Sequence, residues 1–235
     1  MNRLLQPRRP DQLPELTEAT LEALRGEPFA GNIILGGGVA LQHYDNFRAT
    51  QDVDAWWQDF RDENTLAKLL TLLEKVAREH GYELEHRQFG TTDSLEFKSQ
   101  GDNKKVFSFQ ISVRDVSLEE PWISAWPPLL IETFQDNIGS KMNALVNRGA
   151  PRDLLDIYRV VHDSLITSQE CWRLWNTKNP AGNIADAKGK VRTHLNRLEQ
   201  RRPLEHIADA GERSVAELLR TWYKDSFLAM DEEVA

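Results

Sequence analysis

Two aspartates one residue apart, Asp52 and Asp54, have the type and spacing that most directly suggest chemistry. They stand in a short segment, residues 52–57, that is typical of a β-strand. Side chains alternate between the two faces of a strand, so both carboxylates point to the same side. Carboxylates placed in this way can share hard divalent cations, and Mg²⁺ favours carboxylate and phosphate oxygens as ligands. The pair is therefore a candidate Mg²⁺ site.

Three consecutive glycines precede the aspartates. A short apolar run, residues 32–35, is typical of a buried strand and stops at Gly36, Gly37 and Gly38, after which residues 39–44 are predicted to be helical. Glycines in such a turn let backbone N–H groups approach an anion. A Rossmann motif fits poorly, because Leu41 stands where Gly or Ala is needed, and no P-loop Gly-Lys-Ser/Thr follows.

Together, the glycine turn and the aspartate pair indicate metal-assisted phosphoryl or nucleotidyl transfer. The alternative is a structural turn beside two solvated aspartates. Later in the chain, Lys141 and Arg148 share one face of a predicted helix, and Asp153 and Asp156 share one face of the next. Lys141 and Arg152 could neutralise phosphate charge. The alternative here is a set of surface ion pairs on a helical hairpin.

The elements that must position these residues divide the chain into a strand-rich and a helix-rich part. Further strands are predicted over residues 82–89, 94–99 and 106–114, with a helix over residues 63–80 before them. Gly149 suits the end of one helix and Pro151 the start of the next. The predicted C-terminal helices cover residues 132–147, 151–165, 168–176, 183–200 and 212–228.

We therefore expect an α+β fold in which a small mixed β-sheet is flanked by helices and followed by a helical C-terminal half. The sequence divides into an α/β core with an N-terminal arm, residues 1–125, and a helical region, residues 126–235. No apolar run approaches the roughly 20 residues that span a bilayer, and a single cysteine excludes an intrachain disulfide. These features predict a soluble, cytoplasmic protein with no membrane partner.

The charge of the chain is unevenly distributed. The formal net charge of −8 taken alone argues against a nucleic-acid partner. Residues 140–203, however, contain twelve Lys or Arg and six Asp or Glu, a net charge of +6 that leaves −14 for the rest. This asymmetry favours a polyanion or nucleotide face in an otherwise acidic molecule, against the alternative of ordinary solvated helices.

Four segments, in order and at matching spacing, resemble the AbiEii-type toxin nucleotidyltransferases of the polymerase-beta-like superfamily. Members of that family read Gly-Gly-Thr-Ala-Leu, Arg-x-Thr-x-Asp-hydrophobic-Asp, Lys-x-x-Ala-Leu-x-x-Arg and Arg-Asp-x-x-Asp. The matching segments here span roughly residues 33–160: Gly37-Gly38-Val39-Ala40-Leu41, Arg48-Ala49-Thr50-Gln51-Asp52-Val53-Asp54, Lys141-Met142-Asn143-Ala144-Leu145-Val146-Asn147-Arg148 and Arg152-Asp153-Leu154-Leu155-Asp156.

The resemblance implies a sheet with flanking helices, a helical half that closes a cleft, and a role for each matched residue. Asp52 and Asp54 would coordinate two Mg²⁺ ions that hold a nucleoside triphosphate (NTP) and activate an acceptor hydroxyl. Gly37 and Gly38 would present backbone amides to the phosphates, and Lys141 would stabilise the triphosphate charge. Asp153 would support catalysis by orienting Lys141 or a nucleotide group, and Arg48 and Thr50 would brace the turn or touch the nucleotide. Arg152 would also bind the nucleotide, whereas Asp156 could equally be a helix-packing residue.

The chain departs from the family pattern at two points. Val39 replaces the family threonine and removes a hydroxyl. The superfamily usually has a third acid on a later strand, where this sequence offers Ser108, Gln110 and Ser112. Glu96 or Asp153 could substitute for that acid. A catalytically impaired member that binds nucleotide or RNA is therefore the alternative function.

The resemblance also implies an acceptor and a partner. Relatives suggest an acceptor in RNA, such as a tRNA end, which is compatible with the basic segment 140–203. The third possibility is a protein that acts through a partner, as the toxin half of a toxin–antitoxin pair would.

Overall fold

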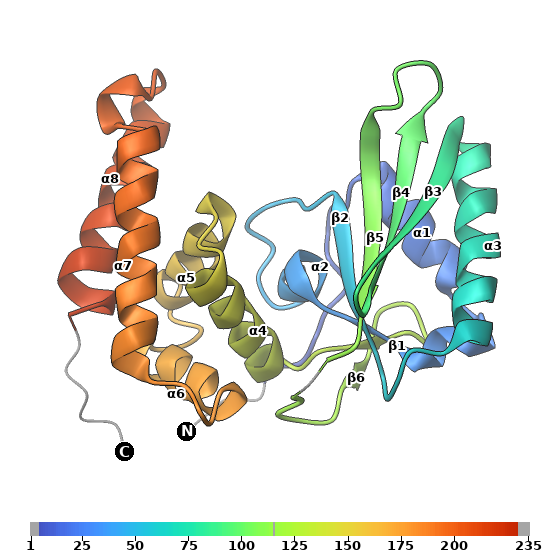
Figure 1. Cartoon of the computed structure of the whole chain (residues 1–235), viewed down its shortest axis with the longest axis horizontal. Helices are drawn as coiled ribbons and strands as arrows, with labels where there is room; N and C mark the ends of the chain where they lie inside the picture. The colour runs from blue at the N-terminus through green and yellow to red at the C-terminus, as the bar shows by residue number, and fades with distance from the viewer. Residues whose placement is uncertain (1–4, 115, 230–235) are drawn as a thin grey trace. The chain divides into compact units, whose positions relative to one another are not determined.

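The chain forms two compact units in the computed structural model, which describes residues 5–114 and 116–229 (Figure 1). The first unit ends at Asn137 and the second begins at Ile138. The division predicted from the sequence lies at residue 125, before the last strand of the sheet. The structural division instead falls within helix α4 (Phe134–Asn147), whose first turn belongs to the first unit.

The first unit contains a seven-stranded mixed sheet with the strand order β3-β4-β5-β2-β1-β7-β6. The pairs β1–β7 and β2–β5 are parallel and the others are antiparallel. The strands are β1 (Ile33–Leu35), β2 (Asp52–Trp57), β3 (Tyr82–Phe89), β4 (Thr92–Ser99), β5 (Lys105–Ser112), β6 (Trp122–Ile123) and β7 (Leu130–Ile131).

Helices cover the apolar face of this sheet. Helix α3 packs on β3 and β4, and α1 packs against α3, beside the sheet in Figure 1. Helix α3 begins where the Asp62 carboxylate accepts hydrogen bonds from the backbone N–H groups of Asn64 and Thr65. The helical elements of this unit before α4 are α1 (Glu15–Leu24), the 3-10 helix η1 (Pro28–Asn32), α2 (Gly37–Gln42) and α3 (Glu63–Glu79).

The second unit is helical throughout its regular structure. Its backbone turns sharply after α4, where Gly149 adopts a left-handed φ of 56°, and α5 starts with Pro151, as the sequence predicts. After α4 come α5 (Pro151–His162), α6 (Ser168–Lys178), α7 (Ile184–Arg201), the 3-10 helix η2 (Leu204–His206), α8 (Ala210–Trp222) and the π-helical turn η3 (Tyr223–Phe227).

The α+β fold expected from the sequence is therefore confirmed. Strands β6 and β7 were not predicted, because two-residue strands carry no periodicity of their own. The last predicted helix, residues 212–228, is divided into α8 and η3. No helix in the described part of the chain is both long enough and apolar enough to cross a membrane.

Candidate active site

Strand β2 places both aspartates on one face of the sheet. Val53 and Ala55 are buried in the core, whereas Asp52 and Asp54 alternate with them on the opposite, partly exposed face. The register of the parallel β2–β5 pair sets Asp52 opposite Ser108 and Asp54 opposite Gln110. The two carboxylates therefore project from the same face, with a hydroxyl and an amide on the neighbouring strand.

Asp52 is held in place by contacts to the neighbouring strand. Ser108 Oγ donates a hydrogen bond of 2.8 Å to Asp52 Oδ1, and Lys105 Nζ lies 4.0 Å from the same oxygen. The Asp52 side chain is 32% exposed. An ionised carboxylate has about four lone-pair sites and can accept from several donors or bind a cation.

The glycine turn packs directly against the second aspartate. Gly37 has a φ of 57°, and a Cβ at this position would collide with the Asp54 carboxylate. Gly36 N–H donates a 2.8 Å hydrogen bond to the backbone carbonyl of Asp54. Gly37 is therefore required both for its left-handed backbone and for the close approach to Asp54.

The residues between the turn and the strand complete this site. A Cβ on Gly38 would stand 2.9 Å from Thr50 Oγ1, so the turn and Thr50 are in contact. Gln42 Nε2 donates a 2.7 Å hydrogen bond to the Arg48 carbonyl and fixes the connecting loop. Of the predicted site residues, the structure thus brings together Gly37, Gly38, Thr50 and Asp54.

The described residues of the first unit place no third acidic ligand beside the pair. In the described part of the first unit, no further His, Cys, Asp or Glu side chain completes a group able to hold a metal. Glu96 lies opposite Ser108 in the β4–β5 register, but its carboxylate is 3.6 Å from Lys98 Nζ. Asp153 belongs to the second unit.

The remaining predicted residues lie in the second unit, where two ion pairs join α4 to α5. Lys141 Nζ is 2.7 Å from Asp156 Oδ2, with both side chains buried. Arg148 forms a two-pronged contact with Asp153, through Nε at 2.8 Å and Nη2 at 2.6 Å. The partner of Lys141 is thus Asp156 rather than Asp153, and the burial of both aspartates contradicts the alternative of surface pairs.

Asp153 also holds the start of α5. Its Oδ2 accepts a 3.0 Å hydrogen bond from Ala150 N–H, which would otherwise be unsatisfied at the helix terminus. Arg152, the neighbouring residue, is exposed on the same first turn.

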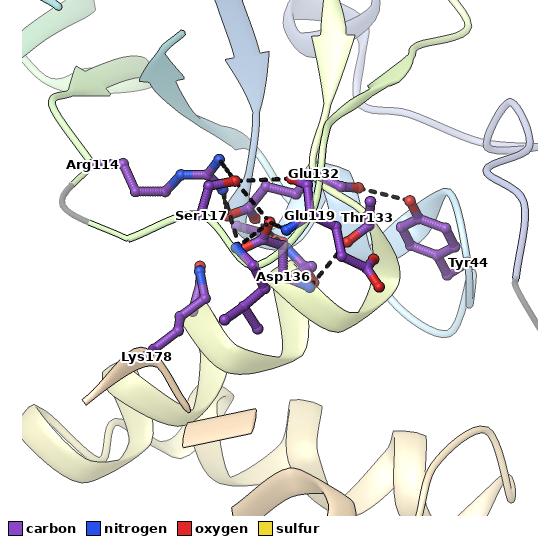
Figure 2. Close-up of polar contacts among 12 residues, drawn as sticks. Tyr44, Arg114, Ser117, Glu119, Glu132, Thr133, Asp136 and Lys178 are labelled. Carbon is purple, nitrogen blue, oxygen red and sulfur yellow. Dashed lines mark hydrogen bonds and ion pairs between the residues drawn. The ribbon is translucent and has the colours of Figure 1, made fainter. Parts of the chain in front are cut away.

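A buried acidic cluster beside the glycine turn was missed by sequence reasoning. Glu132 and Asp136 are almost fully buried, and Arg114 Nη1 lies 3.1 Å from Glu132 Oε1 and 3.5 Å from Asp136 Oδ1 (Figure 2). Asp136 also accepts from Ser117 Oγ and from the backbone N–H groups of residues 118 and 119. The sequence feature that could have pointed to this cluster is an acidic residue, Glu132, directly after the apolar residues 129–131.

Comparisons with known proteins assign the family. The model of the nucleotidyl transferase AbiEii toxin, of a type IV toxin–antitoxin system, matches residues 20–233. None of the curated proteins compared with the sequence matches it.

The solved structures that match this chain are distant in sequence. MenT4, a nucleotidyltransferase toxin from Mycobacterium tuberculosis H37Rv, is 16% identical, with a TM-score of 0.49 over 93% of this chain and 84% of its own. A cytoplasmic RNA terminal U-transferase is 11% identical, with a TM-score of 0.25 over 68% of this chain and 38% of its own. The RNA terminal uridylyl transferase Cid1 is 9% identical, with a TM-score of 0.28 over 63% of this chain and 40% of its own. Because the family model spans most of the sequence, the chain belongs to the AbiEii family of nucleotidyl transferase toxins.

Proposed function

We propose that this protein transfers a nucleoside monophosphate from an NTP to an acceptor hydroxyl, with Mg²⁺ bound by Asp52 and Asp54. The observation that carries this proposal is the pair of same-face carboxylates, of which Asp54 packs against a glycine turn, in a chain of the AbiEii family. In the reaction, the hydroxyl oxygen bonds to the α-phosphorus, the bond to pyrophosphate breaks, and the hydroxyl proton passes to water.

The residues present fit Mg²⁺. This ion is commonly held by one or two carboxylates together with substrate phosphates and water, so a site without a third protein acid is chemically sufficient. Bound Mg²⁺ would supply charge stabilisation for the phosphates and lower the pKa of a coordinated hydroxyl. Ser108 supports this role by fixing Asp52 Oδ1, which orients the carboxylate on the face that it shares with Asp54.

The chain's own groups supply the rest of the nucleotide site. The backbone N–H groups of Gly37 and Gly38 would face the phosphates, while Thr50 and Arg48 would brace the turn or touch the nucleotide. Lys141 would stabilise the triphosphate charge, because an ammonium bonded to Asp156 through one N–H keeps two further donors.

The first turn of α5 would add to the charge stabilisation. Arg152 is exposed there and would contribute a second cation to the phosphates. Asp153 would support catalysis by fixing the turn that carries Arg152.

The acceptor that the chain's charge favours is RNA, such as a tRNA end. The basic segment 140–203, with its net charge of +6, would contact the phosphate backbone. As a member of a toxin family, the protein is expected to have a cognate antitoxin. The alternative function is an impaired enzyme that binds nucleotide or RNA, and the observation in its favour is the absence of a third acid from the described residues around Asp52 and Asp54.

The proposal is tested with purified protein, Mg²⁺, each of the four α-labelled NTPs and total RNA. We expect label to enter RNA with wild-type protein and to fall at least about 100-fold with Asp52→Asn or Asp54→Asn, a loss typical of essential catalytic groups. Asp59→Asn is the matched control, an exposed aspartate just after the same strand. Transfer that survives both substitutions contradicts the assignment, and nucleotide binding without transfer supports the impaired enzyme.

RNA binding has a separate measurement. The affinity for total RNA should fall steeply between about 50 and 200 mM salt if several phosphates are contacted. An affinity that does not depend on salt would exclude the basic segment as the RNA-binding surface.

A further inference from the structure

Asn137 joins the buried acidic cluster to the glycine turn. Its side chain is fully buried, and Nδ2 donates both to Glu132 Oε2 at 2.9 Å and to the carbonyl oxygen of Gly37 at 3.1 Å. Both hydrogens of the amide are therefore used. Glu132 in turn is bonded to Arg114, so one chain of contacts runs from Arg114 through Glu132 and Asn137 to Gly37.

The orientation of the Asn137 amide follows from its partners. A backbone carbonyl and an ionised carboxylate can only accept hydrogen bonds, so the NH₂ group must face both. The carboxylate makes the bond from Asn137 charge-assisted and hence stronger than a bond between neutral groups. Asn137 Oδ1 is buried with no hydrogen-bond partner among the described residues, so the hydrogen bonds given for this amide are those of Nδ2.

Glu132 is itself held rigidly beside the turn. Its backbone N–H donates to the Leu35 carbonyl at 2.9 Å, and its carbonyl accepts from the Tyr44 hydroxyl at 2.6 Å (Figure 2). Burial, and next the charge of Glu132, raise the pKa of Tyr44, so this hydroxyl remains a donor. A shift of Glu132 relative to β1 would therefore break several bonds at once.

The peptide that Asn137 holds lies against the candidate metal ligand. Gly37 contacts the Asp54 carboxylate so closely that no Cβ would fit between them. Any displacement of the Gly37 carbonyl rotates this peptide and changes the space available to the carboxylate.

We propose that Asn137 is a positioning residue for Asp54, acting through the backbone of Gly37, with Glu132 fixing the Asn137 amide. The inference rests on the proposed function, because it gives Asp54 the role of a metal ligand. It goes beyond that function by assigning a task to residues that have no direct contact with the metal. Partners that orient metal ligands commonly affect metal affinity about 10- to 100-fold.

The test compares two neighbouring buried residues. Asn137→Ala removes the link to Gly37, whereas Asp136→Asn weakens the contacts to Arg114 and residues 117–119 without touching the turn. Mn²⁺ binding in the presence of each NTP is followed by electron paramagnetic resonance, together with the Mg²⁺ concentration that gives half-maximal transfer and the Tm. We expect Asn137→Ala to weaken Mn²⁺ binding about tenfold. Asp136→Asn should lower the Tm but leave Mn²⁺ binding unchanged.

Asp54→Asn separates the two proposals. If it does not weaken Mn²⁺ binding, the proposed metal site fails. If it does and Asn137→Ala does not, the positioning inference alone is overturned. Equal effects of Asp136→Asn and Asn137→Ala on Mn²⁺ binding would also overturn it, since they would reflect general destabilisation. Should Asn137→Ala not fold, Glu132→Gln replaces it. The amide oxygen of this variant is uncharged and accepts a weaker hydrogen bond from Asn137, so Mn²⁺ binding should weaken about threefold or more. An unchanged affinity overturns the inference.

Discussion

Lys141 Nζ lies 2.7 Å from Asp156 Oδ2, and the two buried residues join α4 to α5. An ammonium buried without a carboxylate would be strongly disfavoured, so the pair accounts for the presence of a charged lysine at this position. The same bond fixes the direction of the remaining N–H donors. The ion pair thus has both a structural role and, if Lys141 binds triphosphate, a positioning role.

Removing only one partner of this pair should be costly. Lys141→Met leaves the Asp156 carboxylate without the ammonium it is bonded to, and we expect the free energy of unfolding to fall by about 3 kcal/mol. The double variant Lys141→Met/Asp156→Leu should recover most of this loss but no transfer activity. Urea unfolding measures the stability of the single and the double variant. Lys190→Met, which changes an exposed lysine in the same unit, is the control. A double variant as unstable as the single one would contradict the pairing.

The contact between Arg148 and Asp153 predicts a measurable coupling. Two parallel N–H···O bonds to a buried carboxylate are among the stronger side-chain interactions, although Arg148 is 53% exposed. A double-mutant cycle with Arg148→Ala and Asp153→Ala should give a coupling free energy of about 1 kcal/mol. Asp153→Ala should be the more destabilising single change, because Ala150 N–H also loses its acceptor. A coupling near zero would show that the two groups act independently.

Two glycine-to-alanine substitutions should have opposite effects. At Gly37, alanine meets both an unfavourable left-handed backbone and the Asp54 carboxylate, so stability should fall by about 2 kcal/mol and transfer should be lost. At Gly189, in the interior of α7, nothing lies near the added methyl group, and alanine should stabilise the protein by about 0.5–1 kcal/mol. Thermal unfolding compares the two variants. A neutral Gly37→Ala would contradict the close packing of the turn.

Local patterns predicted most of this fold, whereas contacts between distant segments had to come from the structure. Helix α3 (Glu63–Glu79) shows a clear 3.6-residue period, and β2 and β5 alternate, so their existence could be predicted from their own residues. Strand β7 consists of two residues and forms by pairing with β1 on one side and β6 on the other. No local pattern indicates such pairing.

The candidate site likewise contains residues that could be identified from the sequence and residues that could not. Asp52 and Asp54 could be identified because their spacing and the preceding glycines carry the chemical signal. The roles of Glu132 and Asn137 could not, because their partners Arg114 and Gly37 lie far away in the sequence. Likewise, helical spacing alone does not decide whether Lys141 pairs with Asp153 or Asp156, since both lie on one face of α5. Only the packing of α4 against α5 selects Asp156.

His43, which follows the glycine turn, should make the stability of the protein depend on pH. The imidazole is buried, its Nδ1–H donates to the Val39 carbonyl at 2.8 Å, and burial lowers the pKa of His43 from 6.5 to about 4. Between these values the unfolded chain binds a proton that the folded chain excludes. The His43 contribution is therefore fully present above pH 6.5 and is lost as the pH falls toward 4. Between pH 7.5 and 5 it should decrease the free energy of unfolding by about 2 kcal/mol.

The measurement is urea unfolding at a series of pH values. His43→Asn keeps a donor to Val39 but cannot titrate, so its stability should change with pH by about 2 kcal/mol less than that of the wild type over this interval. His206→Gln, at an exposed position, is the control and should retain the wild-type pH dependence. Because the comparison uses the change with pH, it remains valid even if His43→Asn is less stable at every pH. Parallel curves for the wild type and His43→Asn would mean that another group titrates on unfolding, and that His43 does not lose its proton on burial.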